Sequence, residues 1–307
     1  MTGEFDGKRI LVTGASGFVG RHLTRRLLDG GAIVTAVDVL PLPESLRSDE
    51  SGRALEYRQL DIREESAVSA AVGSERWDLL FHLAAIASPR ACAKDFASAY
   101  KVNVQGTFHL LQASSNVARF VFLSSSAVYG APERIPIDED HPRGGKDPYA
   151  MTKILAEDLC RTYASNYQRP CTIIRNFNSF GPYQEAEYVI PSIIRQGLTK
   201  HEIEIWNSEP VRDFSYVANT VDAILQIARA GGESVYNVGS GVGVRIGDLA
   251  TMIASKIDRA MPIRDLRKEV LGSPKLVANV DRLRGLGWSE RVPLSPGIER
   301  TVEWFRQ

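Results

Sequence analysis

A glycine-rich turn between a short apolar segment and a helical pattern is the feature that most constrains the fold. The apolar segment Arg9–Thr13 runs directly into residues 14–20, GASGFVG. Apolar residues then recur every four positions from Val19, which predicts a helix ending at the glycine pair 30–31. Small residues at such a junction allow a tight turn, bring backbone N–H groups close to a pyrophosphate and point a helix N-terminus at its charge. This order of strand, glycines and helix predicts a βαβ unit that binds a dinucleotide.

Apolar segments and helical patterns alternate through the first half of the chain. Further strands are predicted at 32–37, 55–62, 78–83, 120–123 and 171–174, and helices at 64–72, 97–114 and 149–167. Near-continuous apolar strands separated by helices are typical of a parallel sheet covered on both faces. We therefore predict an α/β fold with a Rossmann-type doubly wound parallel sheet.

The alternation loosens after about residue 180. Two shorter strands are predicted at 203–206 and 235–238, between helices and Gly/Pro-rich joints. We predict an NAD-binding domain over 1–180, rejoined by a segment near 211–240. A smaller C-terminal α/β substrate-binding lobe is expected over 181–307.

Two carboxylates at predicted strand ends bear on the choice of dinucleotide. Asp38 ends the second strand, close to the distance at which a carboxylate meets the adenosine ribose hydroxyls. It would repel a 2′-phosphate, and no Arg or Lys follows until Arg47, so we favour NAD over NADP. Asp61, with Ile62 at the end of the third strand, is a candidate to bind adenine, although a purely structural Asp61 is an equal alternative.

A tyrosine, a lysine and a serine form a candidate catalytic set. Tyr149 and Lys153 are four residues apart in a predicted helix and so share one face. An ammonium beside the phenol would stabilise a phenolate, which is otherwise a poor base at neutral pH because tyrosine has a pKa of about 10. Ser125 lies where the fifth strand ends, at the sheet edge where α/β folds bind ligands. An ordinary surface pair is the alternative for Tyr149 and Lys153, and Ser124 and Ser126 are expected to be structural rather than catalytic.

Composition excludes several classes of partner. Lys and Arg total 37 and Asp and Glu total 37, so the net charge is zero and nucleic acid or an anionic membrane is not expected as main partner. No apolar run approaches the roughly 20 residues of a membrane helix. The start lacks a signal-peptide pattern, so a cytoplasmic protein is predicted. Cysteines 92, 160 and 171 are too scattered for a disulfide framework, and HEIE at 201–204 lacks a second histidine, so no metal site is predicted.

The motifs together resemble those of the extended short-chain dehydrogenase/reductases, in the NAD-dependent nucleotide-sugar epimerase/dehydratase branch. The resemblance spans essentially the whole chain. It is carried by TGASGFVG at 13–20, HLAA at 82–85, NVQGT at 103–107, SSSAVYG at 124–130, YAMTK at 149–153, RNFN at 175–178, RDF at 212–214 and NVGSG at 237–241.

The resemblance implies roles for individual residues. Ser125, Tyr149 and Lys153 would be the catalytic triad. The cofactor would be bound by Gly14, Ser16, Gly17, Phe18, Val19, Gly20, Asp38, Asp61, Ile62, Leu83, Ala84, Ala85, Asn103, Tyr149 and Lys153. The nucleotide-diphosphate sugar would be bound by Ser125, Ser126, Asn178 and Arg212, with a further basic contact from Arg267 or Lys268. A structural ion pair is the alternative for Arg212, and a backbone-capping amide for Asn178. The family also implies a homodimer that pairs segments 97–114 and 149–167 in a four-helix bundle.

Departures from the family pattern narrow the reaction. In the family's sugar 4,6-dehydratases, an Asp and a Glu follow the catalytic Thr and act as acid and base, whereas Ser126 and Ala127 stand here. We therefore expect an NAD-dependent nucleotide-sugar epimerase of carbohydrate biosynthesis, acting at C4 through a transient 4-keto sugar with Tyr149 as base. A 4-keto-sugar reductase, or a sugar dehydrogenase or dehydratase with the same triad, is the alternative, and a non-catalytic NAD-sensing protein a remote one.

Overall fold

The computed structural model describes residues 3–47, 55–73, 75–231, 235–268 and 273–307. The chain divides into two compact units, each assembled from separate stretches of sequence. Unit 1 comprises Met1–Val128, Gly145–Arg175 and Ile227–Tyr236, and unit 2 comprises Tyr129–Gly144, Asn176–Gln226 and Asn237–Gln307. The bounds 1–180 and 181–307 stay a prediction. Within the described ranges, no helix has both the length and the apolar character needed to cross a membrane.

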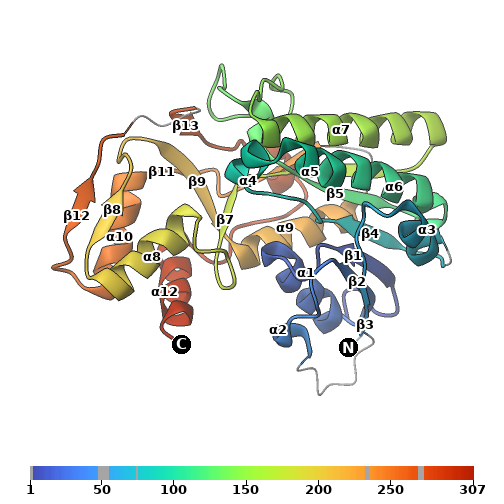
Figure 1. Cartoon of the computed structure of the whole chain (residues 1–307), viewed down its shortest axis with the longest axis horizontal. Coiled ribbons are helices and arrows are strands. Elements are labelled where there is room, and N and C mark those ends of the chain that lie inside the picture. Colours follow the sequence, from blue (N-terminus) through green and yellow to red (C-terminus); the bar gives the residue numbers. More distant parts are fainter. Residues whose placement is uncertain (1–2, 48–54, 74, 232–234, 269–272) are drawn as a thin grey trace. The chain divides into compact units, whose positions relative to one another are not determined.

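A seven-stranded sheet forms the centre of unit 1 (Figure 1). Its strand order is β10-β6-β5-β4-β1-β2-β3. The strands are β1 Arg9–Thr13, β2 Ile33–Asp38, β3 Leu55–Gln59, β4 Leu79–His82, β5 Phe120–Ser125, β6 Cys171–Asn176 and β10 Val235–Val238. The pairs β1–β2, β2–β3, β1–β4 and β4–β5 are all parallel. This topology confirms the predicted Rossmann-type fold.

The strand order reverses direction between β1 and β4, which is where such sheets bind ligands. Thr13 ends β1 opposite Val37 on one side and His82 on the other. The loops that follow β1 and β4 therefore leave the sheet side by side. The glycine-rich turn at 14–20 is one of these loops, and the HLAA motif at 82–85 opens the other.

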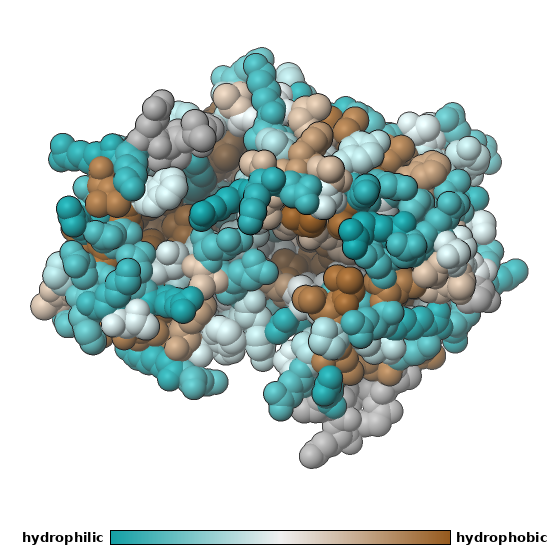
Figure 2. Space-filling view, viewed as in Figure 1, coloured by the Kyte–Doolittle hydropathy of each residue, from teal (hydrophilic) through white to brown (hydrophobic). Residues whose placement is uncertain are grey.

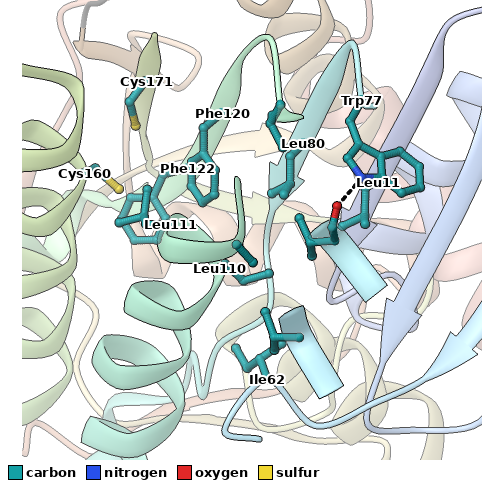
Figure 3. Packing of buried hydrophobic residues seen from close by; sticks show 14 of the residues in the cluster. Leu11, Ile62, Trp77, Leu80, Leu110, Leu111, Phe120, Phe122, Cys160 and Cys171 are labelled. Carbon is teal, nitrogen blue, oxygen red and sulfur yellow. Dashed lines mark hydrogen bonds between the residues drawn. The ribbon is translucent and has the colours of Figure 1, made fainter. Parts of the chain in front are cut away.

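Helices pack on the unit 1 sheet through a core of aliphatic and aromatic side chains (Figure 3). Leu80 on β4 and Phe122 on β5 are at most 1% exposed and belong to the same cluster as Leu110 of the neighbouring helix. Trp77 is 2% exposed, and its indole Nε1 donates a hydrogen bond of 2.9 Å to the carbonyl of Val72. The apolar runs that predicted the strands are therefore buried because helices cover them.

The helices of unit 1 lie between successive strands. They are α1 Phe18–Asp29, α2 Glu44–Arg47, α3 Glu65–Gly73, α4 Pro89–Lys94, α5 Phe96–Tyr100, α6 Gly106–Ala113 and α7 Pro148–Tyr167, with a π-helical turn η1 Lys101–Gln105 and 3₁₀ turns η2 Ser114–Asn116 and η3 Ser126–Tyr129. Helices α4, α5 and α6 lie along α7. The helix predicted at 149–167 is confirmed to within one residue.

The single helix predicted at 97–114 is wrong in detail, because the π-helical turn divides it. The turn contains Asn103, whose carbonyl accepts a 2.7 Å bond from the Thr107 hydroxyl and whose amide bonds outside the helix. Periodicity cannot predict such a turn, because both parts keep an apolar face. The strand predicted at 55–62 ends earlier, at Gln59, where the Asp61 carboxylate accepts a bond from the Arg63 N–H and closes a turn.

Unit 2 is built on smaller sheets. Strand β9 Val211–Tyr216 pairs with β7 Asn178–Phe180, β11 Gly243–Arg245 and β13 Lys275–Leu276, and β8 Ile203–Ile205 pairs in parallel with β12 Ile263–Asp265. Its helices are α8 Val189–Lys200, most of α9 Val217–Ala230, α10 Ile246–Ile257, α11 Asp281–Arg284 and α12 Leu294–Phe305. The strands predicted at 203–206 and 235–238 are present. Residues 232–234, inside the segment 211–240 expected to rejoin the first domain, lie outside the described residues.

Candidate active site

The glycine-rich turn leaves no room for side chains at two of its positions. Gly14 has a φ of +73°, and a Cβ there would lie 2.6 Å from the backbone nitrogen of Ala84. A Cβ on Gly20 would overlap the carbonyl oxygen of Gly14. The start of α1 is thus pressed against the end of β1, which leaves the backbone of the turn open to a phosphate group.

The N-terminus of helix α1 is suited to bind an anion. Its N-cap, Gly17, is extended, with φ −70° and ψ 175°, and among the described residues no side chain caps this end. The N–H groups of a first helical turn have no partner within the helix, and the helix dipole adds partial positive charge there. Phe18 and Val19 supply the first turn, so their predicted contact with the cofactor would be made by the backbone.

Asp38, the last residue of β2, is hydrogen-bonded to the glycine-rich turn. It is 9% exposed, and its carboxylate accepts hydrogen bonds from the backbone N–H groups of Ser16 at 2.9 Å and Leu40 at 3.0 Å. The hydroxyl of Ser16 lies 2.9 Å from that of Tyr57 on β3, and the Tyr57 hydroxyl donates to the carbonyl of Leu40. Sequence reasoning missed Tyr57, because a tyrosine in a strand is too common to be a signal. These bonds fix the carboxylate at the end of β2.

The two residues predicted at the adenine have other bonds in the chain. Asp61 forms an ion pair with Arg63 at 2.5 Å, which holds the pKa of the Asp61 carboxyl below its usual range. Ile62 is 5% exposed, and its side chain lies in the core. Its carbonyl oxygen lies 3.1 Å from Nδ1 of His109. A contact between these residues and adenine stays a prediction, and for Ile62 it would involve the backbone.

The loop after β4 is fixed by buried polar groups. His82 lies 2.8 Å from the Thr13 hydroxyl through Nδ1 and 2.9 Å from the Thr107 hydroxyl through Nε2, and burial lowers its pKa to about 3. The imidazole is therefore neutral. Leu83 follows, its N–H bonded to the Thr13 carbonyl at 3.1 Å, and the backbone of Ala84 lies beside Gly14, with Ala85 next in the loop.

Asn103 forms its side-chain hydrogen bonds with the loop after β4 and with helix α7. It is 1% exposed; its amide oxygen accepts from the Ile86 N–H at 2.8 Å, and its amide nitrogen donates to the Ile86 carbonyl and to the Thr152 hydroxyl. These bonds join the loop after β4 to helix α7. They fix the loop in place, and a contact between Asn103 and the cofactor stays a prediction.

The three predicted catalytic residues lie at one end of the unit 1 sheet. Ser125 is the last residue of β5, and its hydroxyl accepts from the Ala127 N–H at 3.2 Å. Tyr149, 8% exposed on the first turn of α7, packs in a small cluster with Cys92 and against Ala127. Lys153, one turn further along α7, donates from Nζ to the Leu123 carbonyl at 2.9 Å, two residues before Ser125. The structure thus brings the helix pair to the strand end that carries the serine.

The environment of Lys153 weakens its hold on a proton. The side chain is 3% exposed, and its Nζ lies 4.9 Å from the ring centroid of Phe122. Burial lowers the pKa of Lys153 from 10.5 to about 8, because the charged form loses hydration. The ammonium is therefore still the main form at neutral pH.

The neighbours of Ser125 have different surroundings. Ser124 is 3% exposed and donates a 2.7 Å hydrogen bond to the carboxylate of Glu157 on α7. Ser126 is 8% exposed and begins the turn η3. Sequence reasoning missed Glu157, although its place four residues after Lys153 was a signal for the same helix face.

Two of the predicted substrate residues, Asn178 and Arg212, lie in unit 2, whereas Ser125 and Ser126 belong to unit 1. Asn178, on β7, donates from its amide to the Asp213 carbonyl at 2.9 Å, which is the backbone-capping alternative. Arg212, on β9, bonds only the carbonyls of Val211 and Pro274 among the described residues and has no carboxylate partner there. Burial lowers the pKa of Arg212. A half-buried guanidinium without a carboxylate is suited to bind an anion.

Asp213 is the unit 2 residue whose importance the sequence did not reveal. It is fully buried, and its carboxylate accepts bonds from the N–H groups of Ser240, Gly241 and Ala278 and from the Ser240 hydroxyl. Burial raises its pKa, and these four bonds oppose that rise. The Asp of the RDF motif therefore holds the NVGSG loop in place.

A Rossmann-type sheet with a glycine turn at its switch point and a buried carboxylate at the end of the neighbouring strand β2 defines a dinucleotide-binding protein. Residues 10–239 match the model of the NAD dependent epimerase/dehydratase family, and the chain belongs to that family. The turn at 14–20 and Asp38 fit the cofactor of this family. The turn has space for a phosphate only because glycines line it. The Asp38 carboxylate is held in one orientation by hydrogen bonds from two backbone N–H groups. NAD is the cofactor.

Relatives of known activity align along nearly the whole chain. The UDP-glucose 4-epimerase of Mycolicibacterium smegmatis is 32% identical over 97% of this chain and 98% of its own length. The human dTDP-D-glucose 4,6-dehydratase is 29% identical over 98% of this chain and 90% of its own length. The crystal structure of Thermotoga maritima UDP-glucose 4-epimerase with UDP-glucose is similar with a TM-score of 0.87, 28% identity, and coverage of 97% of this chain and 98% of that one. The chain is thus a member of a family of nucleotide-sugar enzymes.

Proposed function

We propose that the chain is a nucleotide-sugar epimerase that inverts C4 through a transient 4-keto sugar, with Tyr149 as the base. The observation that carries the proposal is the position of Lys153, whose Nζ bonds the Leu123 carbonyl two residues before Ser125. That bond supports a shared site, because it ties the helix that carries Tyr149 and Lys153 to the strand that ends at Ser125. A Ser–Tyr–Lys set of this kind suits proton removal from a sugar hydroxyl.

Each member of the set has a separate task. NAD, when bound, supplies a hydride acceptor that can also return the hydride. Tyr149 removes the proton from the C4 hydroxyl and later returns it, and Ser125 donates a hydrogen bond to the same oxygen. Lys153 stabilises the Tyr149 phenolate by its charge. Because Tyr149 is 8% exposed, water competes little for that charge.

The residues after Ser125 favour an epimerase over a dehydratase. Elimination at C5 and C6 needs an acid and a base in addition to the Tyr–Lys pair. The turn η3 that follows Ser125 begins with Ser126 and Ala127, neither of which has a carboxylate. Epimerisation requires no further group, since the proton and the hydride return to the atoms that lost them.

Two features of unit 2 would bind the nucleotide. Arg212 has no carboxylate partner among the described residues and would pair with a phosphate of the diphosphate. Trp206, which follows β8, is 67% exposed, and the ammonium of Lys268 lies 5.4 Å from the centroid of its ring. An exposed indole is suited to stack on a nucleobase. A UDP-sugar is the substrate we expect, because the epimerase relatives act on UDP-glucose.

We also propose a homodimer through α5, α6 and α7. These helices carry exposed apolar side chains, namely Phe96, Tyr100, Phe108, Met151, Leu155 and Tyr167. Tyr167 is 58% exposed. Apolar (brown) side chains interrupt the hydrophilic (teal) surface on the face drawn in Figure 2. A second copy pairing the same helices would bury these side chains. A monomeric mass in sedimentation equilibrium would contradict this proposal.

The test of the function is conversion of UDP-glucose to UDP-galactose by the purified protein, followed by chromatography. Tyr149→Phe removes only the hydroxyl and should abolish turnover while NAD binding is retained. Undiminished turnover by Tyr149→Phe would refute the role of the base. Protein denatured after purification should release NAD in near-stoichiometric amount; an NAD-free protein that binds NADH or NADPH reversibly would favour the reductase alternative.

A further inference from the structure

A buried network of charged side chains joins helix α7 to strands β5 and β6, next to the candidate catalytic residues in the chain. Glu157, on α7, is fully buried, and Arg175, on β6, is 2% exposed. The Arg175 guanidinium donates two hydrogen bonds to the Glu157 carboxylate, of 3.0 Å from Nε and 2.9 Å from an Nη. Ser124 on β5 donates a third, of 2.7 Å. Arg161, whose side chain is 43% exposed, lies 3.2 Å from the same carboxylate.

Stability alone gives little reason for such a network. Removing two charges from water costs several kcal/mol per ion in proteins, and well-packed apolar residues often replace a buried ion pair without loss of stability. The network does, however, connect three elements with directional bonds. Glu157 lies on α7 one turn beyond Lys153, Ser124 immediately precedes Ser125 on β5, and Arg175 belongs to β6.

We propose that Glu157 is a positioning residue for the candidate triad: through Ser124 and Arg175 it fixes α7 on the sheet so that Tyr149 and Lys153 lie beside Ser125. The inference rests on the proposed function, since it assigns Glu157 a task only in relation to that triad. Successive strand residues point to opposite faces. Ser124 bonds Glu157 on the α7 side of β5, so the hydroxyl of Ser125 is not taken up by that bond.

Glu157 also acts on Lys153 through its charge. The titratable groups that face Lys153 are Cys160 and Glu157 from α7, Cys92 from α4 and His82 from β4. His82 is neutral, and burial raises the pKa of both cysteines, so their thiols are protonated. The Glu157 carboxylate is thus the negative charge among these groups, and it favours the ammonium form of Lys153.

The primary experiment is the titration of Lys153 in protein containing ¹³C-labelled lysine, with its NMR signal assigned from Lys153→Met. The variant is Glu157→Gln, and Arg161→Gln is the matched control because it removes the outer partner of the same carboxylate. In Glu157→Gln the pKa of Lys153 should fall, because the carboxylate that favours the ammonium is gone. In Arg161→Gln it should not fall. If Glu157→Gln lowers the melting temperature but leaves the pKa of Lys153 unchanged, the claim that Glu157 acts on Lys153 through its charge is overturned.

The second measurement separates positioning from folding. With UDP-glucose as the substrate, Glu157→Gln should lower kcat about tenfold or more and leave KM nearly unchanged, since misplacing a catalytic group by about 1 Å can cost that much. If Glu157→Gln does not fold, the paired variant Glu157→Gln with Arg175→Gln leaves no unbalanced charge and should fold, still with low kcat. Wild-type kcat in either folded variant would overturn the proposal. Turnover that persists in Tyr149→Phe would instead refute the proposed function, whereas the Lys153 titration needs no turnover.

Discussion

Stability should depend on pH through Lys153, because its ammonium is buried in the folded chain and hydrated in the unfolded one. The pKa of Lys153 is lowered from 10.5 to about 8 in the fold. This difference in pKa corresponds to roughly 3 kcal/mol. The free energy of unfolding is smaller by that amount at a pH where the buried lysine carries its charge. Lys153→Met removes the titrating group and keeps much of the volume, so it isolates this contribution.

The sign of the effect follows from proton counting. Between pH 8 and 10.5 the unfolded chain holds a proton on Lys153 that the folded chain has released. Stability rises with pH wherever the unfolded state binds more protons. The penalty is therefore present in full below about pH 8 and is relieved as the pH rises toward 10.5. Relative to Lys153→Met, the wild type should gain about 2 kcal/mol between roughly pH 7 and 9.5.

The assay is urea unfolding of both proteins, freed of nucleotide, across that pH range. Other titrating groups act equally on both, so the difference in unfolding free energy reports Lys153. Lys153→Met should be the more stable protein at neutral pH, and its advantage should shrink as the pH rises. A difference that stays constant with pH, or grows, would refute the burial of a charged Lys153.

Three further substitutions test the cofactor and substrate sites. Gly20→Ala should abolish NAD binding in calorimetry, because its Cβ would overlap the Gly14 carbonyl, while Gly73→Ala, with open space around the added Cβ, should bind NAD normally; equal binding by both would show that the turn tolerates side chains. Asp38→Asn should raise the affinity for NADP relative to NAD, because the charge that repels a 2′-phosphate is lost; an unchanged ratio would remove Asp38 from cofactor selection. Arg212→Gln should weaken UDP binding by about 2 kcal/mol and leave NAD affinity unchanged. Arg245→Gln, which breaks an exposed ion pair with Glu209, is its control, and equal losses in both would contradict a specific phosphate contact.

The sheet of unit 1 could be predicted from the sequence because its signals are local. Most of its strands are short apolar runs, although β3 Leu55–Gln59 is mixed, and the glycines at 14–20 mark the first turn from the local sequence alone. Helix α7 was equally clear from its helical pattern over 149–167, and the structure adds that Asp147 caps its start and Pro148 is its first residue. The π-helical turn at 101–105 could not be predicted, because it depends on bonds from Asn103 to residues far along the chain.

The same distinction applies to the candidate site. Tyr149 and Lys153 could be nominated from their spacing on a predicted helix, and Ser125 from its place at the end of a predicted strand. Tyr57 could not, because its hydroxyl matters only through Ser16 and Leu40, which reach it from two other loops. Asp213 is similar: its bonds to positions 240, 241 and 278 follow from the tertiary structure, and sequence spacing carries no trace of them.

The outermost strand of the large sheet has a consequence for synthesis and for truncation. Strand β10 is next to β6 in the sheet but follows it by about sixty residues in the chain. During synthesis, the free edge of β6 therefore stays uncovered until residues 235–238 have been made. A fragment ending near residue 180 would contain the glycine turn, Asp38 and the triad, yet would expose the hydrogen-bonding edge of a buried strand. Such edges pair with other chains, so we expect that fragment to aggregate, and a shortened form of the protein must extend at least through β10.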